Sequence, residues 1–66
     1  MKIYTILVSV PESKTALRLA PDGTLTRRKI HAAKVEGRAR AEEIARSINE
    51  GPKNIEAGIT ARVREF

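Results

Sequence analysis

Arginines and lysines are the residues in this sequence whose spacing could support binding chemistry. Arg27, Arg28 and Lys29 are consecutive, Arg62 and Arg64 are two positions apart, and a further arginine sits between two leucines. Side chains two positions apart on a strand share a face, and the planar guanidinium group suits phosphate oxygens. We therefore expect a surface that binds nucleic acid or another anion, made of Arg18, Arg27, Arg28, Lys29, His31, Arg62 and Arg64.

The type of nucleic-acid contact is limited by the scarcity of aromatic rings. Tyr4 and Phe66 are the only rings apart from the imidazole of His31, whereas single-strand binders stack bases on several aromatic side chains. Contacts should therefore go to the phosphate backbone, with little dependence on base sequence, and to duplex more readily than to single strands. The simpler interpretation is a solvated polar face.

A second group of cations, Lys34, Arg38 and Arg40, surrounds the expected start of a helix. A helix N-terminus favours anions, and cations there oppose the helix dipole. This placement predicts a secondary anion site, or else charges that simply reach into water.

The usual signatures of enzymes are missing from the sequence. The four glycines stand apart and form no phosphate-binding loop, and Glu42 and Glu43 are adjacent on the expected helix and diverge. His31 is the only histidine and there is no cysteine, so a zinc site is disfavoured. We expect a non-enzymatic protein with no cofactor, metal or small-molecule substrate.

Composition indicates one small basic domain. The chain has 66 residues, with thirteen Lys and Arg against eight Asp and Glu, which gives a net charge of +5. A surface of this kind attracts polyanions over long distances. The apolar run near the N-terminus is too short to span a bilayer and lacks a cleavage signal. Absence of cysteine fits a reducing compartment, so we expect a cytoplasmic protein.

The first strand is expected over residues 2–10, where β-branched and aromatic residues dominate. Both of its faces are largely apolar, which is typical of a central strand. One helix can cover only one sheet face, so Ile3 and Leu7 would form an exposed apolar patch. Such patches mark interfaces, and a two-fold homodimer would bury this one.

The segment Pro21-Asp22-Gly23 predicts a turn with glycine at positive φ. We expect a hairpin of residues 14–20 and 24–34 around it, with a short helix over 13–20 capped by Ser13 as the alternative. In the second arm, Arg27, Lys29 and His31 would share one face of the strand.

The helix is expected from about residue 37 to 50, because Ala41, Ile44, Ala45 and Ile48 recur at helical spacing. Gly51 and Pro52 should end it. Apolar residues then alternate from Ile55 to Val63, which predicts a last strand. The fold class is α+β with order β-β-β-α-β: a four-stranded mixed sheet, in the order 4-1-2-3, with one helix on one face. The last strand would run parallel to the first; its placement beside the third is the alternative.

Two functions follow from these observations. The first is a small binder of nucleic-acid backbone or of an anionic nucleoprotein surface, a character also typical of phage or mobile-element accessory proteins. The second is a dimeric protein–protein interaction module, for example an inhibitor of a host defence complex, whose charge mainly serves solvation.

Overall fold

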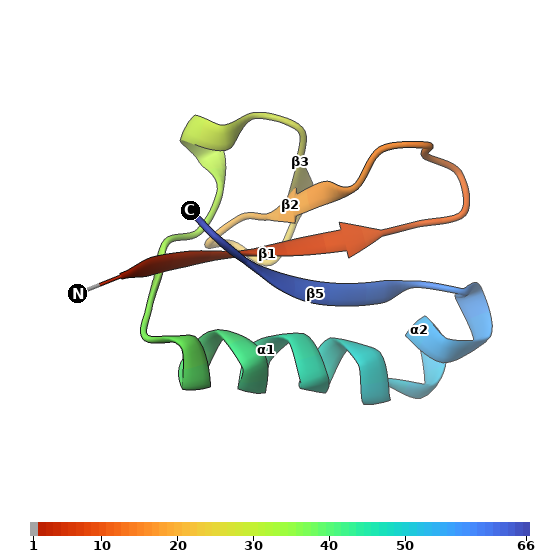
Figure 1. Ribbon diagram of the computed structural model, residues 1–66. Coiled ribbons are helices and arrows are strands. Elements are labelled where there is room, and N and C mark those ends of the chain that lie inside the picture. Colours follow the sequence, from red (N-terminus) through yellow and green to blue (C-terminus); the bar gives the residue numbers. More distant parts are fainter. Residues whose placement is uncertain (1) are drawn as a thin grey trace.

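The fold is α+β, as predicted, with an antiparallel sheet and one main helix (Figure 1). The computed structural model describes residues 2–66. The elements, in chain order, are β1 (Ile3–Ser9), β2 (Leu17–Leu19), β3 (Leu25–Thr26), the 3₁₀ helix η1 (Lys29–His31), β4 (Val35–Glu36), α1 (Arg38–Glu50), α2 (Pro52–Ala57) and β5 (Thr60–Glu65).

The central position of β1 is confirmed. Along one edge it pairs with β5, from Tyr4 opposite Glu65 to Ser9 opposite Thr60. The other edge is shared by β2, which pairs with the second half of β1, and β4, which pairs with its first half. Beyond β2 lies β3. The last strand is thus beside the first, which confirms the favoured order of the expected four strands.

The expectation of a mixed sheet is wrong, because every strand pairing is antiparallel. A single strand was expected over residues 24–34, but β3 ends at Thr26. The Arg28 N–H donates to Thr26 Oγ1 at 3.1 Å, and local bonds of this kind compete with strand pairing. The chain then passes through η1 and returns as β4. This extra reversal makes β5 antiparallel to β1.

The hairpin between β2 and β3 is confirmed, and the alternative helix over 13–20 is wrong. Its turn has Gly23 at φ +89°, a conformation in which glycine carries no steric penalty. The Gly23 N–H donates to the Ala20 carbonyl at 3.0 Å, and the Ala20 N–H donates to the Thr24 carbonyl at 2.8 Å. Asp22 completes the turn by accepting from the Thr24 N–H at 3.0 Å.

The end of α1 at Glu50 is confirmed, but the last strand begins five residues later than expected. Gly51 has φ −66° and precedes a second helix, α2, in which Pro52 occupies the first turn. Proline suits this position because its missing N–H has no helical partner there. Gly58, at φ +74°, ends α2 in the left-handed conformation. The predicted inward face from Ile55 is therefore wrong, and Ile55 is 63% exposed.

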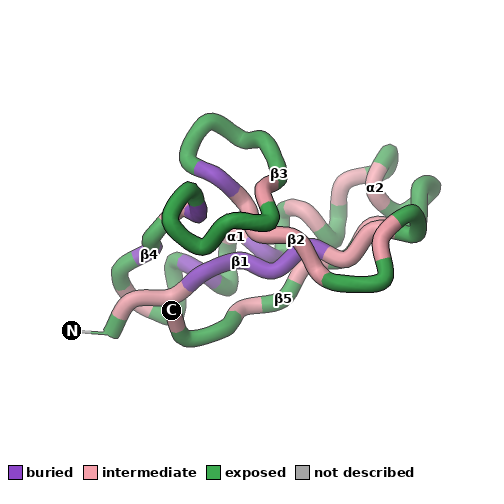
Figure 2. Tube along the Cα trace, turned by 90° about the horizontal axis from the view of Figure 1, so that it is seen from above, coloured by how far each residue is buried: buried purple, intermediate pink, exposed green. Residues whose placement is uncertain are grey.

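The core lies between α1 and one face of the sheet. Ile6 and Val8 of β1 are buried there against Ala41 and Ala45 of α1, with Val35 of β4 beside them. The alanine-rich stripe lets the helix approach the strands closely. Figure 2 shows burial concentrated along β1, while most of the loops are exposed.

Candidate nucleic-acid interface

The sheet face turned away from α1 carries arginines on both sides of β1. In the antiparallel register, Leu7 lies opposite Arg18 of β2 and opposite Arg62 of β5, while Thr5 lies opposite Arg64. Directly opposed residues project from the same face. We call this surface the outer face, and define it by Ile3, Thr5, Leu7, Ser9, Arg18, Thr26, Thr60, Arg62 and Arg64.

The expected apolar patch on this face is not exposed. Leu7 is only 4% accessible and Ile3 is half-buried. Arg18 and Arg62 flank Leu7 from both neighbouring strands, and the aliphatic stem of arginine covers apolar surface while its charged end stays in water. The interface predicted at Ile3 and Leu7 is therefore wrong in its premise, because the monomer already buries Leu7, which a partner was expected to cover.

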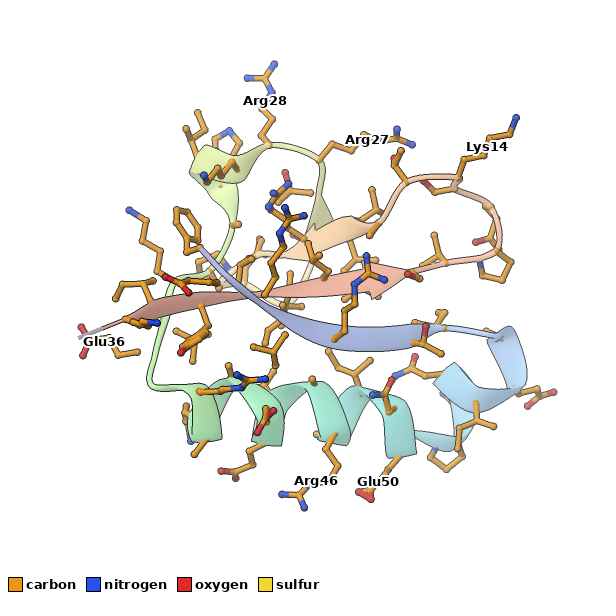
Figure 3. All side chains as sticks on the ribbon, in the orientation of Figure 1. Lys14, Arg27, Arg28, Glu36, Arg46 and Glu50 are labelled. Atoms are coloured by element: carbon orange, nitrogen blue, oxygen red, sulfur yellow. The ribbon has the colours of Figure 1, made fainter. Side chains whose placement is uncertain are left out.

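The connection between β3 and β4 lies on the outer side of the sheet (Figures 1 and 2). It carries the predicted Arg27, Arg28, Lys29 and His31, all of which are exposed. Arg27 and Arg28 project away from the side that α1 occupies (Figure 3). The shared strand face expected for Arg27, Lys29 and His31 is wrong, because these residues belong to a bend and to η1. They nevertheless lie on the same side of the molecule as the outer face.

Phe66 contacts two lysines, and the sequence pattern did not predict these contacts. Its N–H donates to the Ile3 carbonyl at 2.8 Å, which extends the pairing of β5 with β1. The Nζ atoms of Lys29 and Lys34 lie 5.1 and 5.3 Å from the centre of its ring. Ammonium groups at this distance from a ring are attracted to its face. Phe66 thus holds two lysines beside the outer face.

Carboxylates do not neutralise the outer face. Within residues 2–66, two ion pairs form: Lys2 Nζ to Glu65 Oε2 at 3.7 Å, and Arg38 Nε to Glu42 Oε1 at 3.3 Å. Neither includes an outer-face arginine. Strand pairing places one acidic residue, Glu36, on this side. It lies at the end of the sheet where β1 begins (Figure 3).

The three cations predicted as a secondary anion site at the start of α1 make separate contacts. Lys34 contacts the Phe66 ring, and Arg38 pairs with Glu42 on the surface of α1. Arg40 lines a separate shallow groove with Leu19. The three cations therefore have different neighbours.

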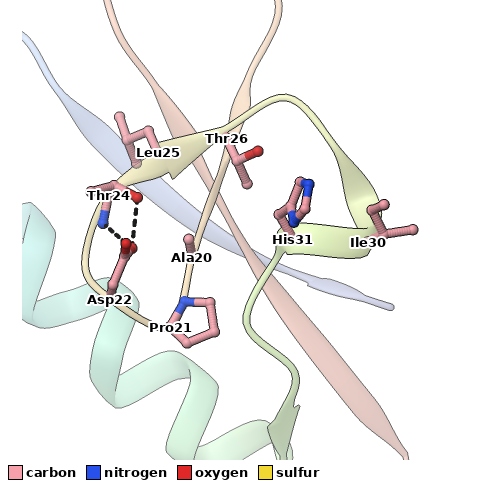
Figure 4. A pocket seen from close by; sticks show the side chains of 8 residues that line it. All are labelled: Ala20, Pro21, Asp22, Thr24, Leu25, Thr26, Ile30 and His31. Atoms are coloured by element: carbon pink, nitrogen blue, oxygen red, sulfur yellow. Dashed lines mark hydrogen bonds between the residues drawn. The ribbon is translucent and has the colours of Figure 1, made fainter.

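A hollow of about 610 Å³ lies between the β2–β3 hairpin turn and η1 (Figure 4). Its lining includes His31, Asp22 and Ile30, which is 80% exposed. Asp22 Oδ1 also accepts a hydrogen bond from Thr24 Oγ1 at 2.6 Å. The two hydrogen bonds from Thr24 lower the pKa of Asp22. This carboxylate therefore stabilises the turn that forms one wall of the hollow.

The part of the chain that the structure describes has neither a cluster of metal ligands nor a membrane-spanning helix. Across residues 2–66, no three His, Asp or Glu side chains gather as metal ligands would. In the same residues, neither α1 nor α2 has the length and apolarity needed to cross a bilayer.

Comparison with protein-family models, with curated proteins and with solved structures gave no match.

Proposed function

We propose that this protein is a non-enzymatic binder of nucleic-acid backbone, with the outer face as its contact surface and duplex as its preferred form. The observation that carries the proposal is that Arg18, Arg62 and Arg64 share one sheet face and, within residues 2–66, form no ion pair with a carboxylate. A guanidinium group that has no carboxylate partner can donate two parallel hydrogen bonds to two oxygens of one phosphate. An arginine that was already bound to a glutamate would have to break that pair first.

The spacing of the arginines supports contact with more than one phosphate. Arg62 and Arg18 stand two strands apart, which is roughly 10 Å, and Arg62 and Arg64 are separated by roughly 7 Å along β5. Arg27 and Arg28 extend the positive charge at the edge of this array. The cations thus cover an area, as backbone contacts to a duplex require.

The aromatic side chains favour readout that does not depend on sequence. Tyr4 packs against the core on the helix side, and Phe66 contacts two lysines. With both rings in use, stacking on bases has no evident platform. Phosphate contacts position a protein on nucleic acid but carry no sequence information.

A fluorescence anisotropy titration with a short labelled duplex DNA tests the proposal. We expect binding at low salt, and a logarithm of the association constant that falls by about 0.9 per neutralised phosphate for each tenfold rise in salt. The double variant R62Q/R64Q should bind more weakly, with a slope lower by about 2. The matched control R40Q/R46Q removes the same charge from α1 and should retain the wild-type slope.

Two results would contradict this function. One is the absence of duplex binding by the wild-type protein at low salt. The other is an equal loss of affinity in both double variants, which would mean that net charge alone drives binding.

We further propose a cytoplasmic location, which the cysteine-free composition favours.

The alternative of a dimeric interaction module has less support, because its expected interface is covered. Leu7 is buried within the monomer, so the patch expected at Ile3 and Leu7 is not open to a second copy. Sedimentation at micromolar concentration measures this directly, and a stable dimer would restore the alternative.

A further inference from the structure

Two hydrogen-bond donors on the outer face are buried without partners. Thr5 is 1% exposed, and its hydroxyl forms no hydrogen bond within residues 2–66. The Arg18 Nε–H is also shielded from solvent and unpaired. Buried polar groups are nearly always hydrogen-bonded, and an exception needs an explanation. Leaving such a group unpaired also destabilises the folded chain.

The two donors are neighbours across β1 and β2. Leu7 lies opposite Arg18, so Thr5 is the diagonal neighbour of Arg18 on the same face. Diagonal neighbours are separated by about 7–8 Å, which a long side chain can span. Arg64 lies directly opposite Thr5 on the other side. Thr5 therefore lies on this face between two strand positions that carry arginine.

The chemistry of these groups specifies an oxyanion. The guanidinium groups can only donate hydrogen bonds, and the threonine hydroxyl can both donate and accept, so a ligand that binds all three side chains would supply acceptor oxygens. The acidic residue on this side, Glu36, lies opposite Ile3 and not opposite Thr5. A phosphate group carries both the oxygens and the negative charge that these three side chains lack.

We propose that Thr5, Arg18 and Arg64 form a discrete phosphate site within the outer face. One phosphate oxygen accepts from the Thr5 hydroxyl and from the Arg18 Nε–H, and Arg64 donates to a second oxygen. This inference rests on the proposed function, because the phosphate is taken to be one in the nucleic-acid backbone. Arg64 is exposed and belongs to neither of the two ion pairs formed within residues 2–66, so its guanidinium group is available to the ligand.

The substitution Thr5→Val separates this site from a structural role, because valine keeps the shape and removes the hydroxyl. We expect the thermal stability of the free protein to be unchanged or higher, since an unpaired buried donor is removed. Duplex affinity should fall about tenfold, which is the lower end for a hydrogen bond to a charged group. The salt slope should not change, because no charge is lost.

Thr60→Val is the matched control. Thr60 is on the same face, opposite Ser9, but it is exposed. This variant should bind duplex as the wild type does. Equal affinity of T5V and wild type would overturn the site, and so would a T5V protein that melts at clearly lower temperature, because the hydroxyl would then be serving the fold.

A second measurement separates failure of the site from failure of the function. The Arg18 Nε–H signal can be followed by ¹H–¹⁵N NMR while inorganic phosphate is added to the wild-type protein and to T5V. A saturable shift in the wild type that is lost in T5V would support the site, even if the duplex does not bind. If the duplex binds but phosphate leaves this signal unmoved, the site is refuted and the proposed function stands.

Discussion

Replacing Asn49 by alanine removes a side chain of α1 that binds the outer edge of β5. The Asn49 amide donates to the Ala61 carbonyl at 2.9 Å and accepts from the Ala61 N–H at 2.6 Å. These are the two bonds that a neighbouring strand would form with one residue, and β5 pairs with β1 on its other edge. The side chain therefore occupies an edge position that could otherwise pair with another chain.

The magnitude follows from the number of bonds and their exposure. Each hydrogen bond contributes about 0.5–1.5 kcal/mol net, and water partly replaces both because the site is exposed. We expect Asn49→Ala to lower the free energy of unfolding by about 1–2 kcal/mol. In a domain of this size, each kcal/mol corresponds to about 4–8 °C in melting temperature.

Urea denaturation followed by circular dichroism measures this loss. Alanine is also the better helix former, so Ser47→Ala, on the exposed surface of the same helix, corrects for propensity. If the corrected loss were below about 0.3 kcal/mol, the limit of additivity between independent sites, the two hydrogen bonds would not stabilise the fold and the reasoning would be refuted.

Two further predictions concern turns. Gly58→Ala should lower the free energy of unfolding by about 1–2 kcal/mol, because Gly58 has φ +74° and an added Cβ would lie 3.2 Å from the Pro11 ring. The same urea denaturation assay measures this loss, and unchanged stability would contradict the prediction. Hydrogen bonds from Thr24 lower the pKa of Asp22 in the folded protein, so its stabilising contribution is complete above the pKa of the unfolded chain and is lost as the pH falls through the folded pKa. The variant D22N should lack this contribution, and the stability difference from wild type should shrink on acidification; a difference that is independent of pH would refute the assignment.

The parts of the fold that were predicted are those set by local patterns. The β-branched run of β1, the helical spacing of Ala41 and Ala45, and the turn at Gly23 each determine their own conformation. The same holds for the arginines of β5, because period two fixes the face of Arg62 and Arg64 once the strand exists.

The parts that failed depend on weaker or tertiary signals. Residues 55–59 alternate between apolar and other residues, which indicates a strand although part of this segment is helical. A helix as short as α2 contains too few turns to show a clear helical period in its sequence. Pro52 was the available signal, as a first-turn proline. The break after β3 comes from one side-chain bond at Thr26. The burial of Leu7 depends on neighbours in β2 and β5, which sequence spacing does not reveal.

The arginines of the outer face have two roles, which are to cover apolar residues of the sheet and to present positive charge to a ligand. The helix α1 covers one side of this sheet, while the connection that contains the short helix η1 lies on the other side (Figure 1). Arg18 and Arg62 lie opposite Leu7, which is buried, and arginine stems at such positions can cover apolar surface while the charged ends reach water. A substitution to alanine would remove the cover together with the charge, and would confuse a loss of stability with a loss of binding. Glutamine keeps part of the stem, and valine at Thr5 keeps the shape, so these variants test ligand chemistry on a face that remains folded.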